Sequence, residues 1–472
     1  MTTVLTIYFL ILVLAVLVGI FINTQGYDVE LTVAILIMSS SAILCYAKDT
    51  QRYDTIKKKL LRPSLLLLLG MSIIVLQNTV DLLIGNLEID SNVFYHRSVI
   101  TKGVSFGAIA MVSYILGGMM AQKPFSYTRE PERVPLTFLT IMSIVFAALF
   151  VGSLDAAFFT GQAYIDSGDI SETHTNNSEV FLNVCNTALI IQYAINQRGK
   201  NLNFVQYVWG LPKPFIAIYI LYIVLVLIGG ARFPALRDLL LLLFAYIYST
   251  HKQPVNNKMV VILMVAASVM FAMISFSRVF VTGDLSAKYN MGMQGLENSK
   301  SFSPTTAELA HSQYCDMLAI DLFEKRDVPF LKGAFQARYM AVNIIPNRIL
   351  QNIWPVTIDK QGSAYYLTAK DMGLDAEIGL GTTIQSDFYM DFGLLGMIIC
   401  MILVGVLLKK IDLTIYHKTD SSYGVFVILI VVYLSACAFY LSRAPFVPMF
   451  RIPMYAYVLI KINALFFRQR TV

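Results

Sequence analysis

The sequence predicts an all-α polytopic membrane protein with about twelve transmembrane helices and one large, partly helical loop. Composition, long apolar runs and alternating positive charge predict this fold class. Of the 472 residues, 57% are hydrophobic and 14% are charged, with a mean hydropathy of +0.64. Soluble domains average about 45–50% apolar and about 25% charged residues. The apolar runs are unbroken, which excludes the short alternating segments of an outer-membrane barrel, and their abundance excludes disorder.

Twelve stretches are long and apolar enough to cross a membrane, which takes about 20 residues. They are residues 4–22, 30–47, 63–84, 99–120, 134–152, 179–196, 214–229, 234–249, 259–281, 392–408, 423–441 and 449–467. The first stretch has no basic region before it and no small-residue cleavage site after it. We therefore expect a retained helix there and not a signal peptide.

Positive charge alternates between successive loops. Nineteen Lys and Arg residues lie in the loops that follow even-numbered stretches and in the C-terminal tail. The loops between stretches 1 and 2 and between stretches 5 and 6 contain none. Because cytoplasmic loops carry the excess of Lys and Arg, both termini and all even-numbered loops are expected in the cytoplasm.

The chain is expected to have three parts. Residues 1–281 hold the first nine spans, residues 282–391 form a large extracytoplasmic loop subdomain, and residues 392–472 hold the last three spans. Loops longer than about 15 residues are usually functional. The chain has no phosphate-binding or dinucleotide-binding glycine motif and no metal-like cysteine spacing, so we expect no cofactor, no metal and no nucleic-acid partner.

Arginines occur in two short outer loops that this topology predicts to be poor in positive charge. Arg232 and Arg237 lie between the seventh and eighth spans, and Arg443 and Arg451 lie between the last two. Three more arginines lie on the same predicted side: Arg278, Arg338 and Arg348. One interpretation is that a loop is assigned to the wrong side, or that the side chains extend to lipid headgroups. The other is that these planar, permanently charged groups bind a phosphate or lipid diphosphate.

The large loop adds aromatic rings and a candidate base. Tyr314 and Tyr339 belong to a set of loop tyrosines that suits stacking against sugar rings, although such rings also form subdomain cores. His311 is the only histidine in residues 282–391 and is a candidate general base, with a structural role as the alternative. Carboxylates elsewhere are further candidate bases: Asp81, Asp155, Asp166, Asp169 and Glu172.

Three stretches resemble a known family. They are Gly229-Gly230-Ala231-Arg232 with Arg237; Ile345-Pro346-Asn347-Arg348-Ile349-Leu350 with Trp354-Pro355 and Asp359-Lys360; and residues 379–396, which end in Phe392-Gly393-Leu394-Leu395-Gly396. Over residues 213–408 the chain resembles the bacterial O-antigen polymerases, the oligosaccharide repeat-unit polymerases of the Wzy family, which are related to O-antigen ligases. Asn347 departs from the family pattern, in which an arginine often follows the proline.

The resemblance implies a GT-C-like glycosyltransferase of the bacterial inner membrane with a large periplasmic loop. Such an enzyme joins undecaprenyl-diphosphate-linked oligosaccharide repeat units, without a metal, and uses them as donor and acceptor. Membrane lipids and a chain-length regulator are the further expected partners. The roles this implies are catalysis by Arg232, Arg237 and His311, and binding of substrate or diphosphate by Arg278, Arg338, Arg348, Arg443, Arg451, Tyr314 and Tyr339.

Three alternatives remain open at this point. An O-antigen ligase would transfer glycan to a lipid A core and is hardly distinguishable by sequence. A flippase for the lipid-linked oligosaccharide would show internal repeats and discontinuous helices lining a cavity, which this sequence lacks. A scaffold protein would leave the outer arginines unexplained.

Overall fold

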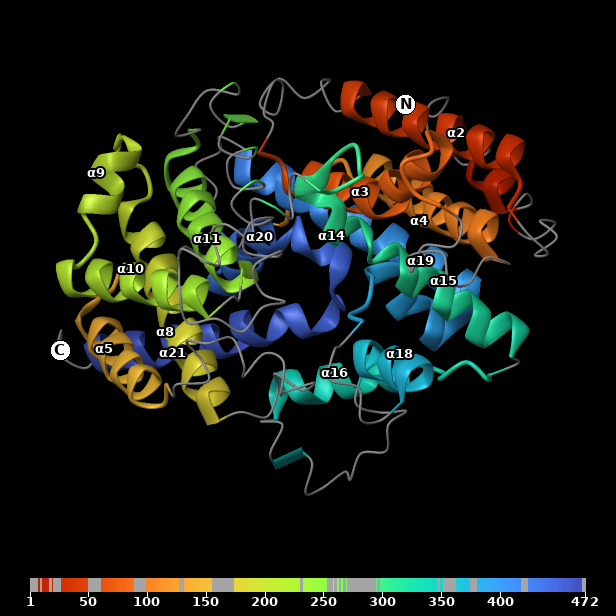
Figure 1. The fold of residues 1–472 in the computed structure, drawn as a ribbon. Helices are drawn as coiled ribbons and strands as arrows, with labels where there is room; N and C mark the ends of the chain where they lie inside the picture. The colour runs from red at the N-terminus through yellow and green to blue at the C-terminus, as the bar shows by residue number, and fades with distance from the viewer. Residues whose placement is uncertain are drawn as a thin grey trace.

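The computed structural model describes most of the chain. The continuous stretches are residues 27–49, 61–88, 99–126, 131–154, 174–229, 232–252, 298–326, 328–345, 362–373, 380–416 and 423–468, with isolated residues in 7–19, 258–269, 294 and 349–350. Within these residues every regular element is a helix. The helices form a broad bundle in which segments far apart in the sequence lie side by side (Figure 1).

Among the residues that the structure describes, seven helices are long and apolar enough to cross a membrane. They are α2 (Val29–Asp49), α3 (Pro63–Leu83), α4 (Ile100–Met120), α8 (His174–Gln197), α11 (Arg232–Thr250), α19 (Ile384–Tyr416) and α21 (Arg451–Arg468). Three shorter apolar helices accompany them: α5 (Thr137–Gly152), α10 (Lys213–Ile228) and α20 (Val425–Cys437). The described part of the chain is therefore all-helical, and its long apolar helices make the protein a polytopic membrane protein.

The outer surfaces of these helices suit a lipid environment. On α19, Leu395, Ile399 and Leu403 are all exposed and recur every four residues, which places them on one helix face. A stripe of large aliphatic side chains facing outward is unfavourable in water but not in hydrocarbon. Exposed large aliphatic side chains also occur on other predicted spans, for example Ile37 of α2 and Leu149 of α5.

Ten of the twelve predicted stretches coincide with these ten helices, whereas stretches 4–22 and 259–281 lie largely outside the described residues. Several boundaries differ from the prediction. The helix expected over 423–441 ends at Cys437, and a 3-10 turn, η7 (Tyr440–Arg443), follows it. Helix α8 begins five residues before the expected 179, and α19 continues to Tyr416, beyond the expected 408. The expected start at 392 agrees with a break in α19 at Gly393, whose φ of 69° and ψ of −172° are open to glycine alone; a helical segment that begins at Ile384 precedes this break.

Helix α19 packs most closely against α4, and glycines permit this close approach (Figure 1). A Cβ atom at Gly117 would lie 2.0 Å from the carbonyl oxygen of Ile402. One at Gly405 would lie 2.1 Å from the carbonyl oxygen of Tyr114. Small residues at such crossings let two backbones touch, which is a common way of joining helices in membranes.

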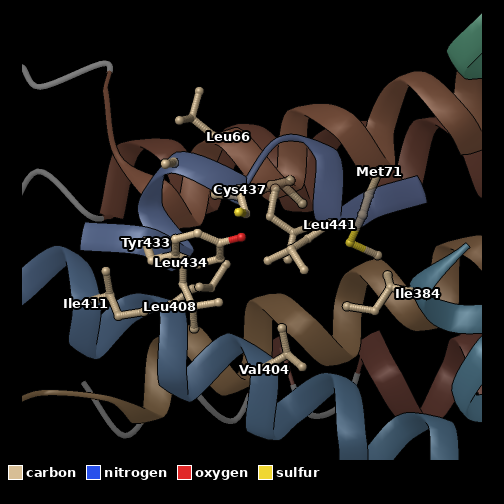
Figure 2. Close-up of a cluster of buried hydrophobic side chains, with 14 of the residues drawn as sticks. Leu66, Met71, Ile384, Val404, Leu408, Ile411, Tyr433, Leu434, Cys437 and Leu441 are labelled. Carbon is tan, nitrogen blue, oxygen red and sulfur yellow. The ribbon is translucent and has the colours of Figure 1, made fainter. Parts of the chain in front are cut away.

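Helix α20 packs between α3 and α19, as the close-up of the core shows (Figure 2). Tyr433, Leu434 and Cys437 of α20 face side chains from both neighbours in this view. The partners are almost fully buried: Met71 from α3 and Val404, Leu408 and Ile411 from α19. The apolar core thus runs continuously through the C-terminal spans and the third span.

The predicted large loop contains short helices that pack against the spans. They are η4 (Pro304–Thr306), α14 (Ala307–Ala310), α15 (Gln313–Ile320), the π-helical turn η5 (Asp321–Lys325), α16 (Ala334–Ile344) and α18 (Ser363–Met372). Helix α14 lies on α3, α15 lies on α4, and α16 lies near α19 and α21. The loop elements are therefore built onto the bundle.

Polar side chains near the end of α3 hold the start of this loop. The buried Asp81 carboxylate accepts hydrogen bonds from the Ser301 hydroxyl (2.5 Å) and the Phe302 N–H (2.8 Å). The Asn78 amide donates to the carbonyl oxygen of Ala310 (2.7 Å), one turn earlier on α3. Asp81 is one of the candidate bases of the sequence. Both of its carboxylate oxygens accept hydrogen bonds from the start of the loop.

Candidate functional site

The structure brings the two arginine-bearing segments together. Phe233, at the start of α11, stacks on Tyr440 of η7, with ring centroids 3.7 Å apart and an interplanar angle of 18°. Phe233 follows Arg232 directly, and Tyr440 lies three residues before Arg443. The segment after the seventh predicted stretch therefore contacts the segment after the eleventh. Some two hundred residues of chain separate them.

Arg443 lies at the centre of a small charged group. Its Nη1 atom is 3.3 Å from Oε1 of Glu308 on α14, and both side chains remain partly open. Desolvation lowers the pKa of the guanidinium, but the Glu308 carboxylate and the neighbouring Tyr440 outweigh it, so the pKa stays above its ordinary value. The cation is permanently charged, held by one carboxylate and partly accessible, as a phosphate ligand requires.

Gly381 lies next to Arg443, in a backbone conformation that favours glycine. This glycine has a φ of +78°, which only glycine adopts freely, and a Cβ atom there would lie 3.9 Å from Nε of Arg443. The turn that contains it precedes α19 and belongs to the stretch 379–396 that resembles the polymerase family. The turn, η7 and α14 together surround the guanidinium.

His311 lies beside this pair, directly after α14, and is exposed. The pKa of its imidazole lies below the ordinary value. Desolvation is the main cause, the Glu308 carboxylate opposes it, and the Arg443 cation lowers the pKa further. The ring is therefore neutral at pH 7, which leaves one nitrogen able to accept a proton. We call Glu308, His311 and Arg443 the arginine site.

The buried carboxylate of Asp316 binds two residues that follow the Gly381 turn. Asp316 on α15 accepts hydrogen bonds from the Thr383 hydroxyl and from Nε2 of Gln385 (2.8 Å). Burial raises the pKa of Asp316 to about 7, although both donors lower it. Tyr314, a predicted sugar-stacking ring, donates its hydroxyl to Oδ2 of Asp371 (2.6 Å) and so ties α15 to α18.

Arg237 lies one turn deeper in α11 and is buried, with 5% of its surface exposed. Its Nε and Nη2 atoms are each 2.8 Å from Oδ1 of Asp238, the next residue. Its guanidinium also lies over the Phe233 ring, 5.9 Å from the centroid. The cation therefore already has a carboxylate partner and supports the stacked ring from behind.

Tyr339 and Arg338 lie in the interior of α16. The Tyr339 hydroxyl donates to Oδ1 of Asp387 (3.3 Å) and accepts from the Ser363 N–H (2.9 Å), which joins α16, α18 and α19. Asp391 accepts hydrogen bonds from the first N–H groups of α16. The Tyr339 ring is therefore buried and held by contacts from two other helices.

The other predicted residues are placed in part. Arg451 begins α21, and among the residues that the structure describes its buried Nε has no hydrogen-bond partner. The backbone of Arg232 begins α11, but its side chain lies outside the described part, as do Arg278 and Arg348. Within the described ranges no group of three His, Cys, Asp or Glu residues is placed to hold a metal ion.

Sequence reasoning missed Glu308 and Asp238. Asp238 had a visible signal, because an acidic residue directly after an arginine in an apolar helix is a ready ion-pair partner. Glu308 had none, since its pairing with Arg443 joins residues 135 positions apart.

No family model, curated protein or solved structure compared with the chain matches it. The fold is therefore inferred from the helices of this chain alone, and the argument for function depends on the arginine site.

Proposed function

We propose that the protein is a membrane glycosyltransferase that joins undecaprenyl-diphosphate-linked oligosaccharide repeat units at the periplasmic face of the bacterial inner membrane. The observation that carries the proposal is the arginine site, where Arg443, Glu308 and His311 meet beside the Phe233–Tyr440 stack. The proposal includes twelve spans, cytoplasmic termini and a periplasmic loop over 282–391, because the alternation of Lys and Arg supports that topology.

The leaving group of this reaction is a lipid diphosphate. The hydroxyl oxygen of the acceptor sugar forms a bond to the anomeric carbon of the donor, and the bond from that carbon to the diphosphate oxygen breaks. Negative charge develops on the diphosphate as its oxygen takes the electron pair. Arg443 stabilises this charge, because a fixed cation in a partly dehydrated site needs no reorganisation during the reaction.

The proton of the attacking hydroxyl passes to the base of the site. His311 is neutral and exposed, so its free ring nitrogen accepts this proton. Glu308 holds Arg443 in place and balances its charge before substrate binds. When the diphosphate arrives, it replaces Glu308 as the partner of the guanidinium, and the freed carboxylate stabilises the protonated imidazole.

Arg237 acts as a positioning residue in this scheme. Its charge is neutralised by Asp238, and its guanidinium fixes the Phe233 ring that stacks on Tyr440. Loss of Arg237 would therefore loosen the contact between α11 and η7. Arg232, at the first position of α11, and Arg451, at the first position of α21, are the further phosphate ligands of the proposal.

The test uses purified full-length protein in detergent with lipid-linked oligosaccharide extracted from the cells that produce it. Polymerase activity extends the glycan and is followed by gel electrophoresis. We expect Arg443→Ala to lower the rate of extension by roughly 100-fold and Arg326→Ala, whose exposed guanidinium pairs with Asp321, to leave it unchanged.

Two outcomes would overturn the proposal. Substrate that binds but is never extended, although no membrane needs to be crossed in detergent, would indicate a flippase. Transfer to added lipid A core in place of extension would indicate an O-antigen ligase.

A further inference from the structure

A second polar cluster lies among the spans, separate from the arginine site. Glu179 of α8 is partly buried and accepts a hydrogen bond from the Tyr222 hydroxyl of α10 (2.8 Å). The Asn183 amide, one turn further along α8, donates to the same carboxylate. Arg237 and Asp238 of α11 interact electrostatically with Glu179. We call Glu179, Asn183, Tyr222, Arg237 and Asp238 the α8 cluster.

The α8 cluster carries one negative charge more than positive charge. Its ionisable groups at pH 7 are two carboxylates and one guanidinium, and the guanidinium is already paired with Asp238. The Glu179 carboxylate accepts hydrogen bonds from two neutral donors, the Tyr222 hydroxyl and the Asn183 amide, and it shares the charge of Arg237 with Asp238. An uncompensated carboxylate among membrane-spanning helices is costly and commonly marks an ion or proton site.

The elements around Glu179 supply no second cation among the groups that act on it. Helix α5 contributes Ser153, which contacts Ser178, and α10 contributes Tyr219 and Tyr222. Helix α20 contributes Tyr433 and Cys437, which act on the Arg237–Asp238 pair. Helix α21 also packs on α8; it begins at Arg451, and its Lys461 is exposed.

Two oxygen atoms of the cluster are buried without a donor. Oδ2 of Asp238 and Oδ1 of Asn183 have no hydrogen-bond partner among the residues that the structure describes, and their residues are 2% and 5% exposed. One turn along the same face of α8, neither amide atom of Asn186 has a partner in this part of the chain. Buried acceptors without donors are rare in proteins, because each costs about 1–3 kcal/mol.

We propose that the α8 cluster binds one exchangeable monovalent cation, a sodium ion or a proton. A sodium ion would take its ligands from the Glu179 carboxylate, Oδ2 of Asp238 and Oδ1 of Asn183, which are hard oxygen donors. A proton would sit on the Glu179 carboxyl group. Either one neutralises the excess charge, and the sodium ion also satisfies the two lone acceptors. The proposal does not rest on glycosyl transfer, although Arg237 belongs both to this cluster and to the support of the Phe233–Tyr440 stack.

The experiment is infrared difference spectroscopy on full-length protein reconstituted in vesicles of phosphatidylethanolamine and phosphatidylglycerol. The first arm exchanges sodium for choline at constant pH, and the second changes pH without sodium. Binding of sodium shifts the carboxylate bands in the first arm. Protonation shows as a carboxylic acid carbonyl band in the second.

Variants assign the bands to the cluster. Glu179→Gln keeps the size and the hydrogen-bonding capacity of the side chain, and we expect it to remove the cation-dependent bands. Glu324→Gln, in an exposed ion pair with Lys102, is the matched control and should keep them. If sodium is the ligand, Asn183→Ala should raise its half-saturation concentration at least about tenfold.

The proposal is overturned if the Glu179→Gln difference spectra match the wild-type spectra in both arms. A thermal unfolding scan in detergent shows whether each variant is folded. If Glu179→Gln does not fold, Tyr222→Phe replaces it, because loss of the hydroxyl that contacts Glu179 should shift the same bands. Unshifted bands in that variant would equally contradict the proposal.

Discussion

The close contact between α4 and α19 predicts a specific cost for adding one methyl group. In Gly405→Ala the new Cβ atom would lie 2.1 Å from the carbonyl oxygen of Tyr114 and 2.9 Å from the N atom of Gly118. Real Cβ atoms essentially never come within 3.0 Å of such atoms. Both contacts are to backbone, so no side chain can rotate away, and the two helices must separate by about 1 Å at this crossing.

The separation weakens an extensive interface. A gap of 0.5–1 Å removes about a quarter to a half of the dispersion energy of each affected contact. Overpacking of this kind usually costs about 1–3 kcal/mol, against which alanine gains up to about 1 kcal/mol over glycine in a helix. We expect Gly405→Ala to lower the free energy of unfolding by about 1–3 kcal/mol. Gly117→Ala should cost a similar amount, and the double variant less than the sum, because one separation relieves both clashes.

Thermal unfolding in detergent, followed by circular dichroism, measures the effect. For a chain of this size the expected loss corresponds to a fall in Tm of a few degrees. The control is Gly152→Ala at the end of α5, where an added Cβ meets nothing within 4 Å and stability should be unchanged or slightly higher. Equal Tm values for Gly405→Ala and Gly152→Ala would refute the backbone-contact argument.

Three further predictions concern charged groups. Arg443→Ala should lower the initial rate of chain extension by roughly 100-fold, and Arg443→Lys should lower it by less. Equal initial rates for Arg443→Lys and the wild type would exclude a role for the guanidinium geometry. Since the pKa of Asp316 is about 7 in the folded protein and ordinarily 3.8, the folded state binds the extra proton, and stability should fall as pH rises from about 4 to 7. Asp316→Asn should flatten this dependence in Tm scans, and an unchanged slope would contradict it. Asp81→Ala should cost about 2–4 kcal/mol in chemical unfolding, because Ser301 and the Phe302 N–H lose their acceptor; an unaffected midpoint would show that the loop is held elsewhere.

Sequence alone predicts most of the long apolar helices well, because a helix that crosses the hydrocarbon core needs about 20 mostly apolar residues. The stretches 63–84 and 99–120 agree with α3 and α4 to within one residue at each end. Boundaries fail where local backbone chemistry intervenes. Hydropathy places the start of the tenth span at residue 392, next to the break at Gly393, but it does not predict that the preceding segment from Ile384 is helical and joins the span at this glycine. A window of mean hydropathy contains no information on such a turn.

The sequence identified two members of the arginine site, His311 and one of several candidate arginines, but not how they come together. Arginine in short outer loops is visible in the sequence, and the structure brings two of those loops together through Phe233 and Tyr440. The residues that contact each arginine in the folded protein determine which arginine stays accessible. Arg237 is neutralised by its neighbour Asp238, whereas Arg443 remains partly open beside Glu308. The distance in sequence between Glu308 and Arg443 hides that pair from any local pattern.

The attachment of the loop to the spans limits how the protein can be re-engineered. Asp81 of α3 fixes residues 301–302, and Asp391 of α19 holds the first N–H groups of α16. A foreign loop grafted between residues 298 and 373 would remove the loop donors of both buried carboxylates. Chimeric proteins that exchange this loop must therefore transfer these α3 and α19 positions with it, since the unit of exchange is the loop plus the helix ends that hold it.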